Sequence, residues 1–205
     1  RLHKQRLEGR LPHAMLFAGA KGVGKVQFAE ALGTTLLCLN PLAGEACGQC
    51  KSCELVKSGS HPDLLRLTPE DVGKVIKVDQ VRAVIDRLHG TAQQGGYRIL
   101  IVHPAEEMNI ASANAILKTL EEPPSHVKFL LATTDPQKLP ATILSRCWQL
   151  KLKNRSPEKI VQHLQNILQA ELVPFDDPPL WQLARSADGS MRDALSLTDP
   201  AIAFG

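Results

Sequence analysis

The fold is decided by one glycine-rich stretch, Gly19-Ala20-Lys21-Gly22-Val23-Gly24-Lys25-Val26. It follows an apolar run at residues 14–18, typical of a strand buried on both faces, and precedes a helical pattern at residues 27–37. A strand, a glycine loop ending in lysine and a helix form a P-loop, whose backbone N–H groups attract phosphate. We therefore predict that Gly19, Gly22, Gly24 and Lys25 form a nucleotide site. A plain strand-to-helix turn that needs glycine is the alternative.

The chain lacks the oxygen ligands that a P-loop uses to hold magnesium. The residue after Lys25 should carry a hydroxyl for the ion, but Val26 stands there. A strand expected at residues 98–102 ends in His103-Pro104, where P-loop ATPases place a metal-binding acid and a catalytic acid. We interpret the following Glu106-Glu107 as solvated residues that open a helix, with displaced catalytic carboxylates as the alternative. ATP binding is therefore expected to be weak or absent.

A second motif is a group of cysteines spaced C-x8-C-x2-C-x2-C, formed by Cys38, Cys47, Cys50 and Cys53. Short loops between thiolates let four sulfurs converge on one tetrahedral ion, so we predict a structural zinc site with no open position for catalytic water. Incidental cysteines and an iron–sulfur cluster are the alternatives. His61 could add a ligand, but we interpret it as a hydrogen-bonding turn residue.

Composition describes an ordinary globular protein. Of 205 residues, 43% are hydrophobic and 22% charged, and the net charge of +3 is compatible with nearby nucleic acid without being diagnostic. No apolar run approaches the length of a membrane span and no signal peptide opens the sequence. Cysteines beside a P-loop suggest a reducing compartment, so we expect a cytoplasmic protein without membrane partners. The ends of the sequence suggest a fragment of a longer chain.

Strands alternating with helices predict a parallel sheet covered by helices on both faces. We expect this α/β domain at residues 1–153, with the zinc module at 38–60. After this point the apolar residues recur at helical spacing, which predicts a small all-helical domain at residues 154–205. Pro200 falls inside the last of these patterns and is expected to kink or interrupt that helix.

Four further segments stand out beside the cysteine insert: residues 114–124 (NAILKTLEEPP), 128–136 (KFLLATTDP), 144–147 (LSRC) and 189–195 (GSMRDAL). Through these segments and the insert, nearly the whole chain resembles the bacterial clamp-loader family of DNA polymerase III. The resemblance implies an AAA+ module: a RecA-like domain, a three-helix lid, and a C-terminal collar domain that this fragment lacks. It also implies a place in a polymerase holoenzyme, a nucleotidyltransferase, whose clamp loader puts the sliding clamp on primed DNA.

Two subunit types of this family compete. The gamma/tau type is the ATPase motor, whereas the delta-prime type keeps the fold without working ATPase residues. Val26, His103 and Pro104 favour the delta-prime type, as does the opening at residues 9–14, whereas residues 189–205 look more like gamma/tau. The expected partners are gamma/tau and delta subunits, the sliding clamp, and primed DNA within the assembled ring.

The resemblance also implies roles for single residues. Arg146 matches an arginine that reaches the ATP of the adjacent gamma/tau subunit as a catalytic arginine finger, although a structural arginine is the alternative. Arg192 matches a lid arginine that senses nucleotide, and here it could only pack the lid. Thr133 and Thr134 occupy the sensor position and are expected to be structural. An active ATPase using Glu106-Glu107, and a zinc-dependent nucleic-acid-binding module, are the competing functions.

Overall fold

The computed structural model describes residues 5–6, 8–71, 73–94 and 96–204. The chain divides into two compact units. The first unit ends at Leu150 and the second begins at Lys151, except that the loop Gly19–Lys25 groups with the second unit. Among the described residues, no helix has both the length and the apolar character needed to cross a bilayer.

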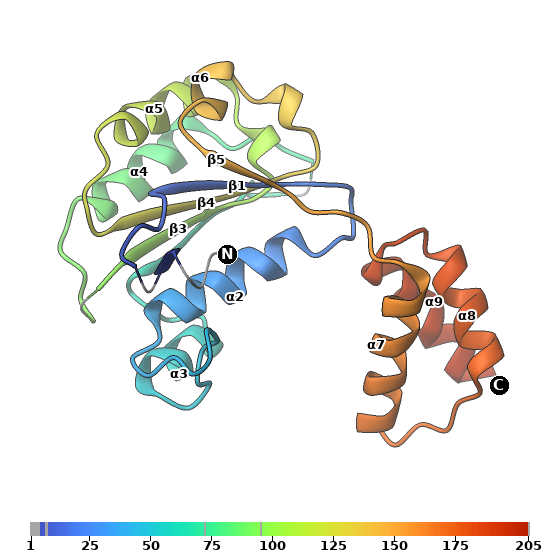
Figure 1. Ribbon diagram of the computed structural model, residues 1–205. Helices are drawn as coiled ribbons and strands as arrows, with labels where there is room; N and C mark the ends of the chain where they lie inside the picture. The colour runs from blue at the N-terminus through green and yellow to red at the C-terminus, as the bar shows by residue number, and fades with distance from the viewer. Residues whose placement is uncertain (1–4, 7, 72, 95, 205) are drawn as a thin grey trace. The chain divides into compact units, whose positions relative to one another are not determined.

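The first unit is built on a five-stranded sheet with the strand order β2-β3-β4-β1-β5 (Figure 1). The strands are β1 (Ala14–Ala18), β2 (Leu64–Leu67), β3 (Arg98–Val102), β4 (Val127–Thr133) and β5 (Trp148–Lys151). The pairs β2–β3, β3–β4 and β4–β1 are parallel, so the carboxyl ends of these strands meet at one edge. The predicted α/β fold class is therefore confirmed.

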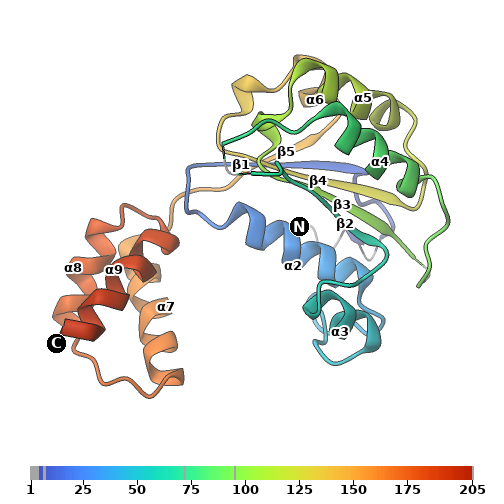
Figure 2. The ribbon, with the colours of Figure 1, turned by 180° about the vertical axis from the view of Figure 1, so that it is seen from behind.

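Helices cover both faces of this sheet, as Figures 1 and 2 show from opposite sides. Helix α2 lies on one face, with the short α3 beside its C-terminal end, and α4, α5 and α6 lie on the other face. Their bounds are α2 (Lys25–Leu37), α3 (Lys51–Lys57), α4 (Val78–Leu88), α5 (Ile110–Glu121) and α6 (Ala141–Leu144). Single 3₁₀ turns follow β3 and β4, as η1 (Ala105–Glu107) and η2 (Pro136–Lys138).

Burial explains the strand patterns. All residues of β3 and β4 are buried, because these strands lie inside the sheet with helices on both faces. In contrast, β5 alternates between half-buried and exposed residues, as expected for an edge strand with one face towards solvent. The other edge strand, β2, does not alternate in this way, because three of its four residues are buried.

The second unit contains three further helices, α7 (Pro157–Ala170), α8 (Asp177–Ser186) and α9 (Met191–Phe204). They share an apolar core formed by Ile160, Val161, Leu164, Leu168, Leu180, Ala184, Ala187, Met191 and Ala194. Pro200 was expected to kink or interrupt the last helix; it does not interrupt it, because α9 continues through this residue to Phe204. A proline removes one backbone hydrogen bond, and the turn that follows it here is the last of the helix.

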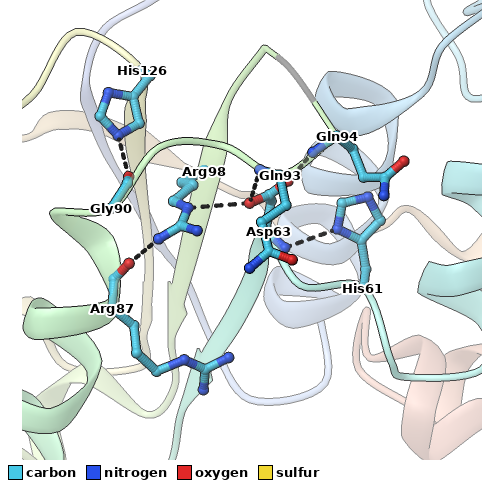
Figure 3. A network of polar contacts seen from close by, with 8 residues as sticks. All are labelled: His61, Asp63, Arg87, Gly90, Gln93, Gln94, Arg98 and His126. Carbon is cyan, nitrogen blue, oxygen red and sulfur yellow. Dashed lines mark hydrogen bonds and ion pairs between the residues drawn. The ribbon is translucent and has the colours of Figure 1, made fainter.

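A buried ion pair ties the edge strand β2 to its neighbour β3 (Figure 3). Arg98 Nε donates to Asp63 Oδ1 at 3.1 Å, and the side chains are 8% and 0% exposed. The backbone N–H groups of Gln93 and Gln94 donate to the two carboxylate oxygens at 2.9 Å each. Arg98 also donates to the carbonyl oxygen of Arg87 at the end of α4. Asp63 thus holds the loop between α4 and β3 in place and also neutralises the buried charge of Arg98.

We predict that Asp63→Ala lowers the free energy of unfolding of the first unit by about 3–5 kcal/mol, because it leaves the guanidinium of Arg98 buried without its carboxylate. The matched control is Asp79→Ala, which removes an 86% exposed carboxylate that pairs with Arg82 at 3.4 Å. The control should cost less than about 1 kcal/mol. Urea titrations followed by circular dichroism measure both losses. Equal losses in the two variants would contradict the structural importance of the buried pair.

Candidate nucleotide and metal sites

The glycine loop has the backbone conformation that a P-loop requires. Gly22 and Gly24 have φ angles of 84° and 90°, in the left-handed region that favours glycine. Lys25 is 5% exposed. Its ammonium group donates to the carbonyl oxygens of Gly19 at 2.9 Å and Ala20 at 2.7 Å. The lysine charge therefore stabilises the loop itself, and a bound phosphate would have to compete with these carbonyl groups.

Two of the glycines also lie where a side chain would not fit. An ideal Cβ on Gly19 would stand 2.6 Å from the carbonyl oxygen of Leu152, and one on Gly22 would stand 1.9 Å from Ser190 Oγ. These contacts require glycine whether or not a nucleotide binds. Arg192, the candidate lid arginine, is exposed in the first turn of α9.

The positions expected to hold magnesium carry no oxygen ligand in their side chains. Val26 lies half-buried in the first turn of α2, and His103-Pro104 follows β3 directly. The nearest acid after β3 is Glu106, in the 3₁₀ turn η1. Glu106 and its neighbour Glu107 are therefore the two residues of this turn that could supply a carboxylate at this end of β3.

The interpretation of Glu106 as a solvated residue is wrong. Its Oε1 accepts hydrogen bonds from the backbone N–H of Thr134 at 2.9 Å and from the Thr134 hydroxyl. Burial raises the pKa of Glu106, but hydrogen bonds from the hydroxyls of Thr134 and Thr133 and from the Thr134 N–H outweigh it, so the pKa falls below its ordinary value. The carboxylate thus connects η1 to the end of β4, a link that the sequence pattern did not indicate.

The four cysteines of the predicted metal module converge. Their Sγ atoms all lie within 4.8 Å of one another, with 3.5 Å between Cys38 and Cys47 and 3.9 Å between Cys38 and Cys50. A disulfide needs about 2.05 Å, so these are free thiols. Zinc–sulfur bonds of about 2.3 Å in a tetrahedron put the sulfurs about 3.8 Å apart, which fits this cluster. The cysteines could therefore hold one metal ion with a complete protein shell.

The surroundings of the cluster shift the pKa values of two of its thiols in opposite directions. Burial opposes ionisation of Cys50, but backbone N–H groups of Cys53 and Leu39 and the neighbouring thiols lower its pKa to about 6. Burial and then the hydrogen bond with Cys50 raise the pKa of Cys53 to about 12. Neighbouring thiolates repel one another, so without a metal ion some of these closely spaced sulfurs keep their protons. A bound divalent cation would offset this repulsion and favour the thiolate form of all four cysteines.

His61 stands outside the cysteine cluster, which confirms its interpretation as a turn residue. Its Nδ1 accepts from the backbone N–H of Asp63 at 3.1 Å (Figure 3). Its Nε2 lies 2.9 Å from Ser52 Oγ, and that hydroxyl donates to the carbonyl oxygen of Leu37. Burial lowers the pKa of His61, in agreement with a neutral ring that accepts at Nδ1. The ring thus joins the cysteine module to β2.

Arg146 follows α6 and remains at the surface, with 34% of its side chain exposed. Its Nη2 donates to Glu121 Oε1 at 2.6 Å, and its Nη1 donates to the carbonyl oxygen of Thr142 at 2.9 Å and to Ser145 Oγ at 3.4 Å. The guanidinium of Arg146 therefore lies outside the core, and these hydrogen bonds fix its orientation. Its partner Glu121 lies 25 residues earlier, so local sequence gave no signal of this contact.

We predict about one equivalent of zinc per chain, because the sulfur spacing fits a tetrahedral zinc shell. Elemental analysis should detect this zinc, and Cys50→Ser should abolish it. Cys147→Ala is the control, since Cys147 is buried outside the cluster. Chelation should loosen residues 38–60 more than the sheet, as measured by hydrogen exchange. Clearly substoichiometric zinc, or an iron chromophore, would contradict the assignment.

Comparison with known families and proteins places both parts of the chain in one system. Residues 1–156 match the family described as DNA polymerase III, delta subunit, and residues 159–205 match the DNA polymerase III clamp loader subunit, ATPase lid domain. The chain is 45% identical to DNA polymerase III subunit tau/gamma of Haemophilus influenzae over 97% of its own length, which is 28% of that protein. It is 47% identical to subunit delta′ of Pseudomonas aeruginosa over 67% of its length, 42% of that protein.

Solved structures support the same fold. The Thermotoga maritima RuvB Holliday junction branch migration motor aligns with a TM-score of 0.63 and 17% identity, covering 97% of this chain and 57% of that one. A DNA polymerase III gamma subunit-related protein from the same organism aligns with a TM-score of 0.56 and 21% identity, over 89% of this chain and 57% of that one. These likenesses confirm the predicted AAA+ fold. By its family matches, the chain belongs to the DNA polymerase III clamp-loader family.

Proposed function

We propose that this chain is part of a delta-prime-type clamp-loader subunit that does not hydrolyse ATP and that completes the active site of a neighbouring gamma/tau ATPase. The observation that carries the proposal is a contrast between two places in the molecule. The magnesium positions Val26 and His103-Pro104 have lost their oxygen ligands, whereas Arg146 is held at the surface by defined partners. In this proposal the subunit acts in the cytoplasm, helping to load the sliding clamp onto primed DNA.

The proposed division of labour follows the two parts of the chain. Residues 1–153 act as the RecA-like domain and residues 154–205 as the lid. Zinc at the cysteine cluster stabilises an insert that is too small to build its own core. It takes no part in chemistry, because four thiolates leave no position for water.

Arg146 would act in trans by electrostatics. A guanidinium at the γ-phosphate of an adjacent ATP stabilises the charge that develops in phosphoryl transfer, and arginine fingers contribute about 10³–10⁵-fold to such reactions. A partly exposed arginine with defined hydrogen-bond partners is accessible at the surface and already oriented, as an interface role needs.

An ATPase motor of the gamma/tau type is the second candidate. It is favoured by 45% identity to a tau/gamma subunit over most of the chain and by the lid match. Glu106 would have to replace the lost acids. Its Oε1 already accepts two hydrogen bonds from Thr134, so its use as a metal ligand or catalytic base would require this link to break. Val26 would still leave magnesium without the P-loop hydroxyl.

We predict no measurable ATP hydrolysis by the isolated chain. The missing magnesium hydroxyl and the missing acids each remove an electrostatic contribution worth roughly a hundredfold or more in rate. Phosphate release measured with purified protein tests this expectation, with Lys25→Ala as the control for contaminating ATPases. Turnover that survives purification and disappears in Lys25→Ala would refute it and support the motor candidate.

We predict that Arg146→Ala leaves the chain folded and able to assemble with gamma/tau subunits, because the side chain supports little of the core. DNA-stimulated ATP turnover at the adjacent site should fall by roughly a thousandfold or more. Total turnover should fall less, since the other motors would receive arginines from one another. Clamp loading onto primed DNA is the second readout. Normal loading by the variant complex would rule out the role in trans, and failure of the variant to fold would make Arg146 structural.

A further inference from the structure

The side chain that orients Arg146 is Glu121, the last residue of α5. The 2.6 Å contact joins Arg146 Nη2 to Glu121 Oε1, and the two side chains are 34% and 45% exposed. The other two acceptors, the carbonyl oxygen of Thr142 and Ser145 Oγ, belong to α6 and the turn after it. Glu121 therefore links the guanidinium to a second helix, α5, and fixes the position of Nη2.

These contacts leave part of the guanidinium available. Arginine carries five N–H donors in a planar fork. Within the part of the chain that the structure describes, three donor contacts are made, all from the two Nη atoms. The Nε–H and one Nη2–H thus remain for an acceptor outside the chain. Both are charged N–H donors, and such donors form strong, short hydrogen bonds to carboxylate or phosphate oxygens.

The exposure of the pair argues that its purpose is orientation. An ion pair with both partners this exposed contributes little to the stability of a fold. A long arginine side chain has many rotamers in solution, and a contact that selects one of them lowers the entropy lost when the group engages a reacting phosphate. A carboxylate at this position can select that rotamer and still leave the Nε–H and one Nη2–H available.

We propose that Glu121 is a positioning residue that holds the guanidinium of Arg146 ready for a phosphate of a neighbouring subunit. This inference rests on the proposed role of Arg146 in trans. Glu121 acts through Arg146 and does not touch the nucleotide itself. Glu122 provides the matched comparison. It is the adjacent carboxylate and is also exposed, and it makes no ion pair within the described residues.

The test uses complexes assembled with gamma/tau and delta subunits, sliding clamp and primed DNA, and measures ATP turnover at the site next to this chain. Glu121→Ala should lower kcat about tenfold to a hundredfold, the size of effect that misplacing a catalytic group produces. KM for ATP should stay unchanged, because the arginine acts in the transition state. Glu121→Gln should recover much of the loss, since its amide oxygen can accept from Nη2 at the same reach. Glu122→Ala should behave as the unmodified chain.

A double-variant cycle separates the possible outcomes. Glu121→Ala combined with Arg146→Ala should be no slower than Arg146→Ala alone, because the carboxylate works only through the arginine. If Arg146→Ala is defective and Glu121→Ala is normal or faster, the positioning role is refuted and the function in trans stands. If Arg146→Ala is itself normal, both fail. An additive loss in the double variant, or an equal loss in Glu121→Gln and Glu121→Ala, would also overturn the positioning role.

Discussion

The parallel pairing of β3, β4 and β1 between two helix layers is the constraint on which the rest of the molecule depends. Every residue of β3 and β4 is buried, so these strands cannot shift without exposing apolar side chains or burying polar ones. Their register brings Ala18, Thr133 and the end of β3 to one edge. Each candidate feature lies within a few residues of one of these strand ends. The glycine loop follows β1, His103 follows β3, and the contact between Thr134 and Glu106 joins the ends of β4 and β3.

The chain separates two parts of P-loop chemistry that usually occur together. The first part depends on backbone conformation and on packing, and it persists, since Gly19 and Gly22 lie against Leu152 and Ser190 and tolerate no side chain. The second part depends on side-chain oxygens for magnesium, and Val26 has none. Packing can thus preserve a nucleotide-type loop after its chemistry has been lost. In the proposed function, the remaining chemistry of the chain lies at Arg146, which is used by a neighbour.

Much of the fold could be predicted from the sequence because its signals are local. Continuous apolar runs indicated β1, β3 and β4, alternation indicated the edge strand β5, and the cysteine spacing indicated the four converging thiols. The contacts that were not predicted join residues far apart in the chain. Asp63 meets Arg98, Glu106 meets Thr134 and Glu121 meets Arg146 over separations of 35, 28 and 25 residues. Charged side chains carry no periodic signal that pairs them, so only the folded arrangement reveals these partners.

The central claim is that this chain acts on a neighbour's nucleotide and not on its own, and one comparison tests it directly. Lys25→Ala and Arg146→Ala are introduced separately into this chain, and DNA-stimulated ATP turnover is measured for each assembled clamp loader. The account predicts that Arg146→Ala lowers turnover at the adjacent site, whereas Lys25→Ala leaves turnover at the level of the unmodified complex. A loss of turnover in Lys25→Ala with normal turnover in Arg146→Ala would contradict it and identify the chain as a motor.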